Sequence, residues 1–315
     1  MVPGMKREII YSLRSPYRDE FRICGYRFGS GEKTACIVGA IRGNEVQQLY
    51  MCSQLVGILK RLEEKGAIAS GRELLVIPSV NSFSMNIGKR FWAVDNTDIN
   101  RSFPGDPSGE ITQRIAAGVF TEAQQYQYGI QFASFYMPGD FIPHVRMMET
   151  GFQTSSLASL FGLQYVVVRK PKPVDTSTLN YNLQKWKINA FSVYTNQTEA
   201  IDEKSASLGV GAVLRFLMRM GIIKYSSHGG YISSVVKEEE LLSVKTTAAG
   251  IFRRLKNPSD EVNFGEAVAE ILHPYEGSVL ARINAPTDGI VFFTNNQPLV
   301  MENTVVCKII RRMHV

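Results

Sequence analysis

Polar side chains that could bind an anion lie just after several apolar runs of this sequence. Two arginines stand among them, and an arginine guanidinium binds a carboxylate through two parallel hydrogen bonds. Four separate segments contribute to the set, and its members are Arg42, Glu45, Asp98, Asn100, Arg101, Ser134, Tyr194 and Thr195. We expect these segments to meet at one edge of a sheet, where they would form a site for a ligand that carries a carboxylate.

The segment that organises this set is ACIVGAIRGNE at residues 35–45. Its apolar half is typical of a buried strand, a glycine turn follows, and apolar residues at helical spacing begin near Glu45. A second buried strand is predicted at residues 73–78, so strand, helix and strand form a βαβ unit with a parallel pair. Arg42 and Glu45 then lie at the carboxyl end of a strand, where open α/β sheets bind their ligands.

The remaining periodicity of residues 1–230 predicts an α/β domain. Further strands are predicted at 7–13, 21–28, 128–133, 165–168 and 190–194, and helices at 45–65, 110–125 and 202–220. Residues 81–106 and 134–146 lack a period and are predicted as irregular, the first as a functional loop anchored by its aromatic residues. We therefore expect a mixed, mostly parallel sheet flanked by helices.

Residues 231–315 predict a separate all-β module, because short alternating runs are broken by turn residues every eight to twelve positions. The strings AAGIFRRLKNPSDEVNFGEAVAEI and INAPTDGIVFF resemble a small barrel-sandwich domain of the biotinyl/lipoyl type. Such carrier domains present a lysine at a hairpin tip, but the corresponding turn, LHPYEGS at 272–278, has none. We therefore expect a cover near the pocket mouth or an oligomer contact rather than a carrier.

Composition narrows the class of protein. The chain has 315 residues, and its formal charge of +6 comes from Lys and Arg that are dispersed rather than clustered, which argues against nucleic-acid binding. Four cysteines lack C-x-x-C spacing, and Cys36 and Cys52 fit a strand and a helix as small core residues, as in a reducing compartment. No run of about eighteen apolar residues is present. We expect a cytoplasmic protein that binds neither nucleic acid nor membrane.

Five strings follow one another along the chain: VGAIRGNE, IPSVN, TDINRSFPG, GIQFAS and AFSVYT. In this order they resemble the succinylglutamate desuccinylase/aspartoacylase family of the zinc carboxypeptidase superfamily, whose D-L-N-R-x-F-P-G string is close to DINRSFPG. The resemblance implies a zinc-carboxypeptidase-like α/β fold, one zinc ion as the family cofactor, and cleavage of amide bonds of acylated amino acids.

The resemblance also implies roles for residues at matching positions. Asn100 and Arg101 match the pair that grips the substrate carboxylate, and Arg90 lies where the family keeps an arginine that can polarise the scissile carbonyl. Asn81 matches a structural asparagine, and Glu45 matches the zinc-ligating glutamate. The substrate-binding part of the family site is therefore expected to persist in this chain.

The metal-binding part is altered. Arg42 stands in place of the first histidine ligand, Ala133 in place of the third ligand, and Tyr194 in place of the general-base glutamate. Catalytic zinc usually needs three protein ligands plus water, and without zinc there is no water of low pKa to attack an amide. Arg42 would also put a fixed positive charge where the dication sits, and its salt bridge to Glu45 could fill that position. We therefore predict no cofactor.

The roles of His144 and Tyr194 are left open. With Glu45, Glu149 or Asp98, His144 could form a new metal or acid–base centre. Isolated histidines without a spacing partner rarely ligate metal, which favours a loop histidine hydrogen-bonded to backbone. Tyr194 is either a general acid or an aromatic residue that ends a strand.

These residues lead to alternative functions. The favoured one is a deacylase-like scaffold without zinc chemistry that binds a small carboxylate, such as an acylated amino acid or peptide, or regulates a partner. The alternative is a metal-dependent amide hydrolase, an N-acyl amino acid deacylase or carboxypeptidase, with a rearranged site that uses Glu45 and His144. An inactive subunit paired with an active paralogue, or a homo-oligomer, is also consistent with the sequence.

Overall fold

The computed structural model describes residues 4–16 and 19–312, and the chain divides into two units. The first unit comprises Met1–Ser134 and Pro143–Val235, and the second comprises Phe135–Ile142 and Val236–Val315. The sequence predicts a single boundary after residue 230. The structure differs because the eight-residue segment Phe135–Ile142, which interrupts the first unit in the chain, belongs to the second unit. This segment contains a short strand, Gly139–Phe141, that pairs with the strand Gly289–Asn295 of the second unit.

In chain order the elements of the first unit are β1 (Lys6–Leu13), β2 (Phe21–Gly29), β3 (Gly31–Ala40), α1 (Val46–Glu64), β4 (Gly71–Ser79), α2 (Ser82–Met85), η1 (Ile99–Arg101), α3 (Ile111–Ala123), β5 (Tyr128–Ala133), β7 (His144–Met148), α4 (Ser155–Ser159), β8 (Tyr165–Arg169), η2 (Pro173–Asp175), α5 (Leu179–Lys185), β9 (Asn189–Tyr194) and α6 (Glu203–Arg219). Strand β10 (Ser234–Lys237) begins in the last two residues of the first unit.

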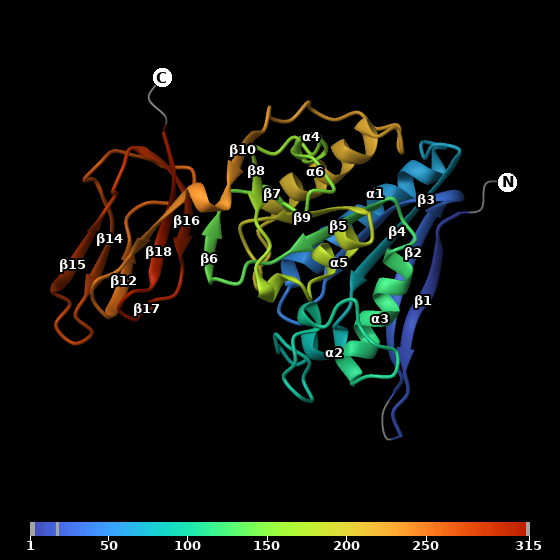
Figure 1. Ribbon diagram of the computed structural model, residues 1–315, viewed down its shortest axis with the longest axis horizontal. Helices are drawn as coiled ribbons and strands as arrows, with labels where there is room; N and C mark the ends of the chain where they lie inside the picture. Colours follow the sequence, from blue (N-terminus) through green and yellow to red (C-terminus); the bar gives the residue numbers. More distant parts are fainter. Residues whose placement is uncertain (1–3, 17–18, 313–315) are drawn as a thin grey trace. The chain divides into compact units, whose positions relative to one another are not determined.

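One nine-stranded sheet forms the first unit, in the order β1-β2-β4-β3-β5-β9-β7-β8-β10 (Figure 1). Its centre is parallel: β3 pairs with β4 and β5, and β5 pairs with β9. Strands β1 and β2 join antiparallel at one side, and β7 runs antiparallel to β9. The predicted mixed sheet and the parallel βαβ unit of β3, α1 and β4 are confirmed.

Helices cover both faces of this sheet (Figure 1). On one face α1 and α6 pack together over the sheet, with Met51, Leu55 and Leu59 of α1 fully buried in the shared core. On the other face α3 and α5 pack with residues of the long loop 81–106 over a second core. Because β-strand side chains alternate between faces, β3 and β9 contribute to both cores.

Two regions predicted as irregular contain short elements. The loop 81–106 includes α2 and the 3-10 turn η1, and Trp92 and Phe103 are buried in it as the prediction of an anchored loop requires. Residues 134–146 include β6 (Gly139–Phe141) and the start of β7. Their partners lie far along the chain: β6 pairs with β16, and β7 pairs with β8 and β9. Because these strands form through such distant pairing, the local sequence shows no alternation of apolar and polar residues that would predict them.

The second unit is all-β, as predicted, and consists of antiparallel sheets. One sheet has the order β11-β18-β16-β13 with β6 added beside β16, and the other has the order β15-β14-β12-β17. Their bounds are η3 (Glu238–Glu240), β11 (Leu241–Lys245), β12 (Gly250–Arg254), β13 (Glu261–Val262), β14 (Ala267–Leu272), β15 (Val279–Asn284), β16 (Gly289–Asn295), β17 (Leu299–Val300) and β18 (Val305–Arg311). Val268, Ile271 and Ile309 lie in their common core.

No helix among residues 4–16 and 19–312 is long and apolar enough to span a membrane.

The cysteines give a prediction about reactivity. Cys36, Cys52 and Cys307 are buried, and burial raises the pKa of all three thiols, to about 12 for Cys36 and Cys307. Cys24 is the half-buried one. Since the thiolate is the reactive form, we expect brief alkylation of the folded protein at pH 8 to label Cys24 alone. Mass spectrometry counts the labels, with denatured protein and a Cys24→Ser variant as controls; early labelling of Cys36 would contradict the described core.

Candidate functional site

The turn between β3 and α1 is held by the long loop 81–106. Gly43 N–H donates to the Arg90 carbonyl at 2.9 Å. A Cβ added at Gly43 would meet the Lys89 carbonyl oxygen at 2.2 Å and Ser84 Cβ at 2.7 Å, so this close approach of two backbones requires glycine. The turn and the loop together therefore fix where the Arg42 side chain starts.

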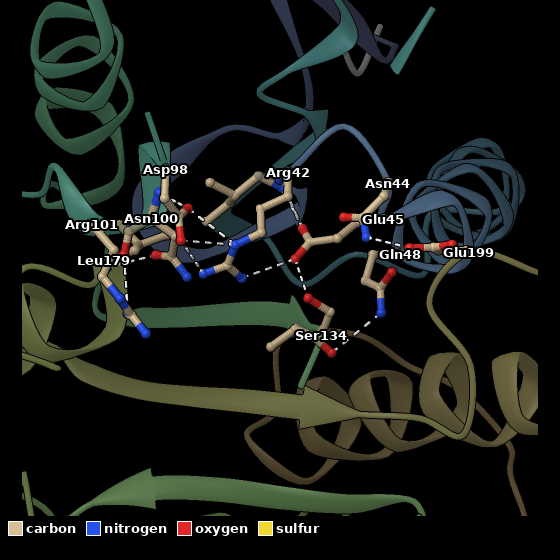
Figure 2. A network of polar contacts seen from close by, with 12 residues as sticks. Arg42, Asn44, Glu45, Gln48, Asp98, Asn100, Arg101, Ser134, Leu179 and Glu199 are labelled. Carbon is tan, nitrogen blue, oxygen red and sulfur yellow. Dashed lines mark hydrogen bonds and ion pairs between the residues drawn. The ribbon is translucent and has the colours of Figure 1, made fainter. Parts of the chain in front are cut away.

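Arg42 lies between two carboxylates (Figure 2). Its Nε is 3.1 Å from each carboxylate oxygen of Asp98, and its Nη2 is 2.8 Å from Asp98 Oδ2. Its Nη1 is 3.2 Å from Glu45 Oε1, which confirms the predicted salt bridge. The guanidinium is buried; its ion pair with Asp98 joins the end of β3 to the loop 81–106, and its ion pair with Glu45 lies within the turn.

Glu45 is fully buried, and both of its carboxylate oxygens are used. Oε2 accepts hydrogen bonds from the backbone N–H groups of Ile41, at 2.8 Å, and Arg42, at 3.0 Å. Oε1 accepts from Arg42 Nη1 and from the Ser134 hydroxyl at the end of β5. The carboxylate is thus held by the turn that precedes it and by the neighbouring strand.

The electrostatics of Arg42 follow from this pairing. Burial would lower the pKa of its guanidinium, but the charges of Glu45 and Asp98 outweigh burial and raise the pKa above its ordinary value. Arg42 is therefore a permanent cation at this position.

These residues do not fit the zinc ion of the resembling family. A guanidinium already neutralises Glu45, the one matching ligand, and a dication beside it would meet a fixed positive charge. Among residues 4–16 and 19–312, no three of His, Cys, Asp and Glu are grouped so that they could hold a metal ion. A rearranged metal site built on His144 with Glu45, Glu149 or Asp98 is thus not among the groupings of these described residues.

Arg90 and Arg101 are half-buried beside Arg42 and form no ion pair with any residue in the described part of the chain. Burial lowers the pKa of both guanidinium groups, and repulsion from Arg42 lowers it further. Arg90 Nε is buried without a hydrogen-bond partner, and Arg101 Nη1 reaches only the Asn100 carbonyl, at 3.3 Å. Two cations in a partly desolvated position that no described carboxylate pairs are a ready site for an anion.

Asn100 has a structural part in the same region. Its backbone N–H donates to Asp98 Oδ1 at 2.9 Å, and its Oδ1 accepts from the Leu179 N–H at the start of α5, at 3.2 Å. The Nδ2 of its amide makes no hydrogen bond to any described residue. That Nδ2 is the atom with which Asn100 could contact a ligand next to Arg101.

Tyr194 and His144 lie together on the sheet, although His144 was expected in a loop. His144 is the first residue of β7, fully buried and paired with Tyr194 of β9. Their rings stack with centroids 5.0 Å apart and planes 2° apart. The guanidinium of Arg146 lies 4.8 Å from the centre of the Tyr194 ring. The loop interpretation of His144 is wrong, because β7 forms only through its pairing with β8 and β9. Ala133 lies beside Tyr194 in the register of β5 and β9.

Sequence reasoning did not find two contacts of the site. Asp98 belongs to the polar residues predicted to meet at the sheet edge, but its ion pair with Arg42, across 56 positions, does not follow from the sequence. The hydrogen bond from Ser134 to Glu45 spans 89 positions. The only feature of the sequence that points to these two contacts is a polar residue within a predicted loop or at the end of a predicted strand.

The described geometry defines an open α/β protein with an arginine-rich site at the carboxyl edge of a mixed sheet. Residues 31–218 match the family model of the succinylglutamate desuccinylase/aspartoacylase catalytic domain. The chain therefore belongs to the succinylglutamate desuccinylase/aspartoacylase family, as the resemblance predicted.

Individual relatives agree with this family. A succinylglutamate desuccinylase from Silicibacter sp. has a similar structure, with a TM-score of 0.82 and 17% identity over 97% of this chain and 94% of that one. An aspartoacylase family protein from Mesorhizobium loti gives a TM-score of 0.80 and 20% identity over 99% and 96%. The N-alpha-acetyl-L-2,4-diaminobutyric acid deacetylase of Halomonas elongata is 30% identical over 83 residues, which span 26% of this chain and only 22% of that protein.

Proposed function

We propose that this protein binds a small carboxylate ligand of the N-acyl amino acid or peptide type and has lost the zinc-dependent hydrolysis of its family. The observation that carries the proposal is the Arg42 guanidinium, ion-paired with Glu45 and Asp98 where the family resemblance places a zinc ligand. The Halomonas relative, named as a deacetylase of an N-acetylated amino acid, supports the class of ligand.

The charge balance of the site supports an anionic ligand. Arg42 contributes one positive charge, and Glu45 and Asp98 contribute two negative charges, so this triad carries a net charge of −1. Arg90 and Arg101 add two positive charges that no described carboxylate pairs. Since guanidinium groups bind carboxylates in a bidentate manner, the two unpaired arginines are the expected anchors.

Substitution of an anchor tests the proposal. We expect Arg101→Met or Arg90→Met to weaken binding of an N-acyl amino acid by about 10- to 100-fold, because each change removes a hydrogen bond to a charged group. Isothermal titration calorimetry with a panel of N-acetyl amino acids measures the dissociation constants. The thermal midpoint of unfolding should hardly change, since neither arginine is part of an internal ion pair.

The matched control is Arg61→Met, which removes a charge from the exposed last turn of α1. This control should bind like the unaltered protein. Equal binding by the Arg101 and Arg61 variants would contradict the assigned anchor, and hydrolysis of panel members by the unaltered protein would contradict the loss of chemistry.

A further inference from the structure

A second group of polar side chains lies one pleat below the altered positions Ala133 and Tyr194. Gln131 of β5 and Ser192 of β9 are paired in the sheet register, and each precedes its altered neighbour by two residues on the same strand. Because strand side chains alternate, Gln131 lies on the same face as Ala133, and Ser192 lies on the same face as Tyr194. Asn180 of α5 covers this row, and its Nδ2 donates a hydrogen bond to the Ser192 hydroxyl.

Two atoms of this row are buried without a partner in the described protein: Gln131 Nε2, a donor, and Asn180 Oδ1, an acceptor. Gln131 is 3% exposed and Asn180 is 5% exposed. Buried polar groups are nearly always hydrogen-bonded, so these atoms call for a partner from outside the chain. An unpaired donor and an unpaired acceptor in one row match a partner that accepts one hydrogen bond and donates another.

We propose that Gln131 and Asn180 form a subsite for the intact amide group of the ligand. The carbonyl oxygen of the amide accepts from Gln131 Nε2, and its N–H donates to Asn180 Oδ1. The inference rests on the proposed function, because Arg90 and Arg101 hold the carboxylate of the same molecule. Such a subsite recognises an amide through two neutral side chains rather than through a bound metal ion.

The test compares an amide with its ester isostere. The tightest-binding member of the N-acetyl amino acid panel and the matching O-acetyl hydroxy acid differ only in that an ester oxygen replaces the amide N–H. We expect the unaltered protein to bind the amide about tenfold more tightly, since the ester leaves the Asn180 acceptor without its donor. In Asn180→Leu this preference should fall to about twofold or less. Gln131→Met should weaken amide and ester alike, because both have the carbonyl.

Gln54→Met serves as the control, because it removes an amide side chain from the exposed face of α1. It should change the dissociation constant of neither the amide nor the ester. Circular dichroism and thermal midpoints establish that the variants are folded. An ester that binds as tightly as the amide overturns the subsite while leaving the carboxylate site intact. Absence of binding by every panel member overturns the proposed function and the subsite together.

Discussion

Replacement of Arg42 by methionine is expected to lower the free energy of unfolding by about 3–5 kcal/mol, because a buried ion pair loses one partner. Glu45 is completely buried, and in the variant its charge would keep only the backbone N–H groups and Ser134. Asp98 would lose its contacts with the same guanidinium. The effect should exceed that of any single arginine elsewhere in the site.

Urea-induced unfolding followed by circular dichroism measures this difference. Arg101→Met is the matched control, since it removes a neighbouring guanidinium without breaking an ion pair. Addition of Glu45→Gln to the Arg42→Met variant should recover part of the stability, because the amide removes the unpaired charge. A loss below about 1 kcal/mol for Arg42→Met would show that the pairing behaves like a surface salt bridge.

The double substitution Arg42→His with Ala133→His should create a zinc site. It removes the competing guanidinium and adds imidazoles at the two altered ligand positions, so that with Glu45 three protein ligands are present, the number that catalytic zinc sites use. Zinc would then supply the positive charge that Arg42 supplies to Glu45. We expect the variant to bind about one equivalent of zinc.

Titration of zinc in competition with a chromogenic chelator measures the affinity of the double variant. The single variant Ala133→His, which keeps Arg42, should bind far more weakly. Glu45→Gln in the double variant should weaken binding again, because it removes the carboxylate ligand. Equal zinc affinity with and without Arg42 would show that the guanidinium does not occupy the metal position.

Features that depend on near neighbours in the chain could be predicted from the sequence. The strand, turn and helix around Arg42 are encoded by a continuous apolar run, a glycine and a helical period, and the structure has β3, the turn and α1 there. The salt bridge between Arg42 and Glu45 spans three positions of the same turn. Its prediction required only the residue types and the end of a strand.

Features that depend on distant pairing could not be predicted. The prediction of a loop at His144 rests on an irregular stretch with two prolines, yet the pairing of β7 with β8 and β9 buries His144 in the sheet. The stacking of His144 on Tyr194 follows from that register and from nothing local. In the same way, residue types placed Asp98 in the site, but only the folded loop shows that it shares Arg42 with Glu45.

We infer that the Arg42 guanidinium takes the place of the family's metal ion, and the zinc content of the unaltered protein tests this most directly. The protein is produced in zinc-supplemented medium, dialysed, and measured by plasma mass spectrometry beside the Arg42→His, Ala133→His variant. We predict less than about 0.1 equivalents of zinc in the unaltered protein and about one in the variant. About one equivalent in the unaltered protein, removable by a chelator and lost on Glu45→Gln, would contradict the account.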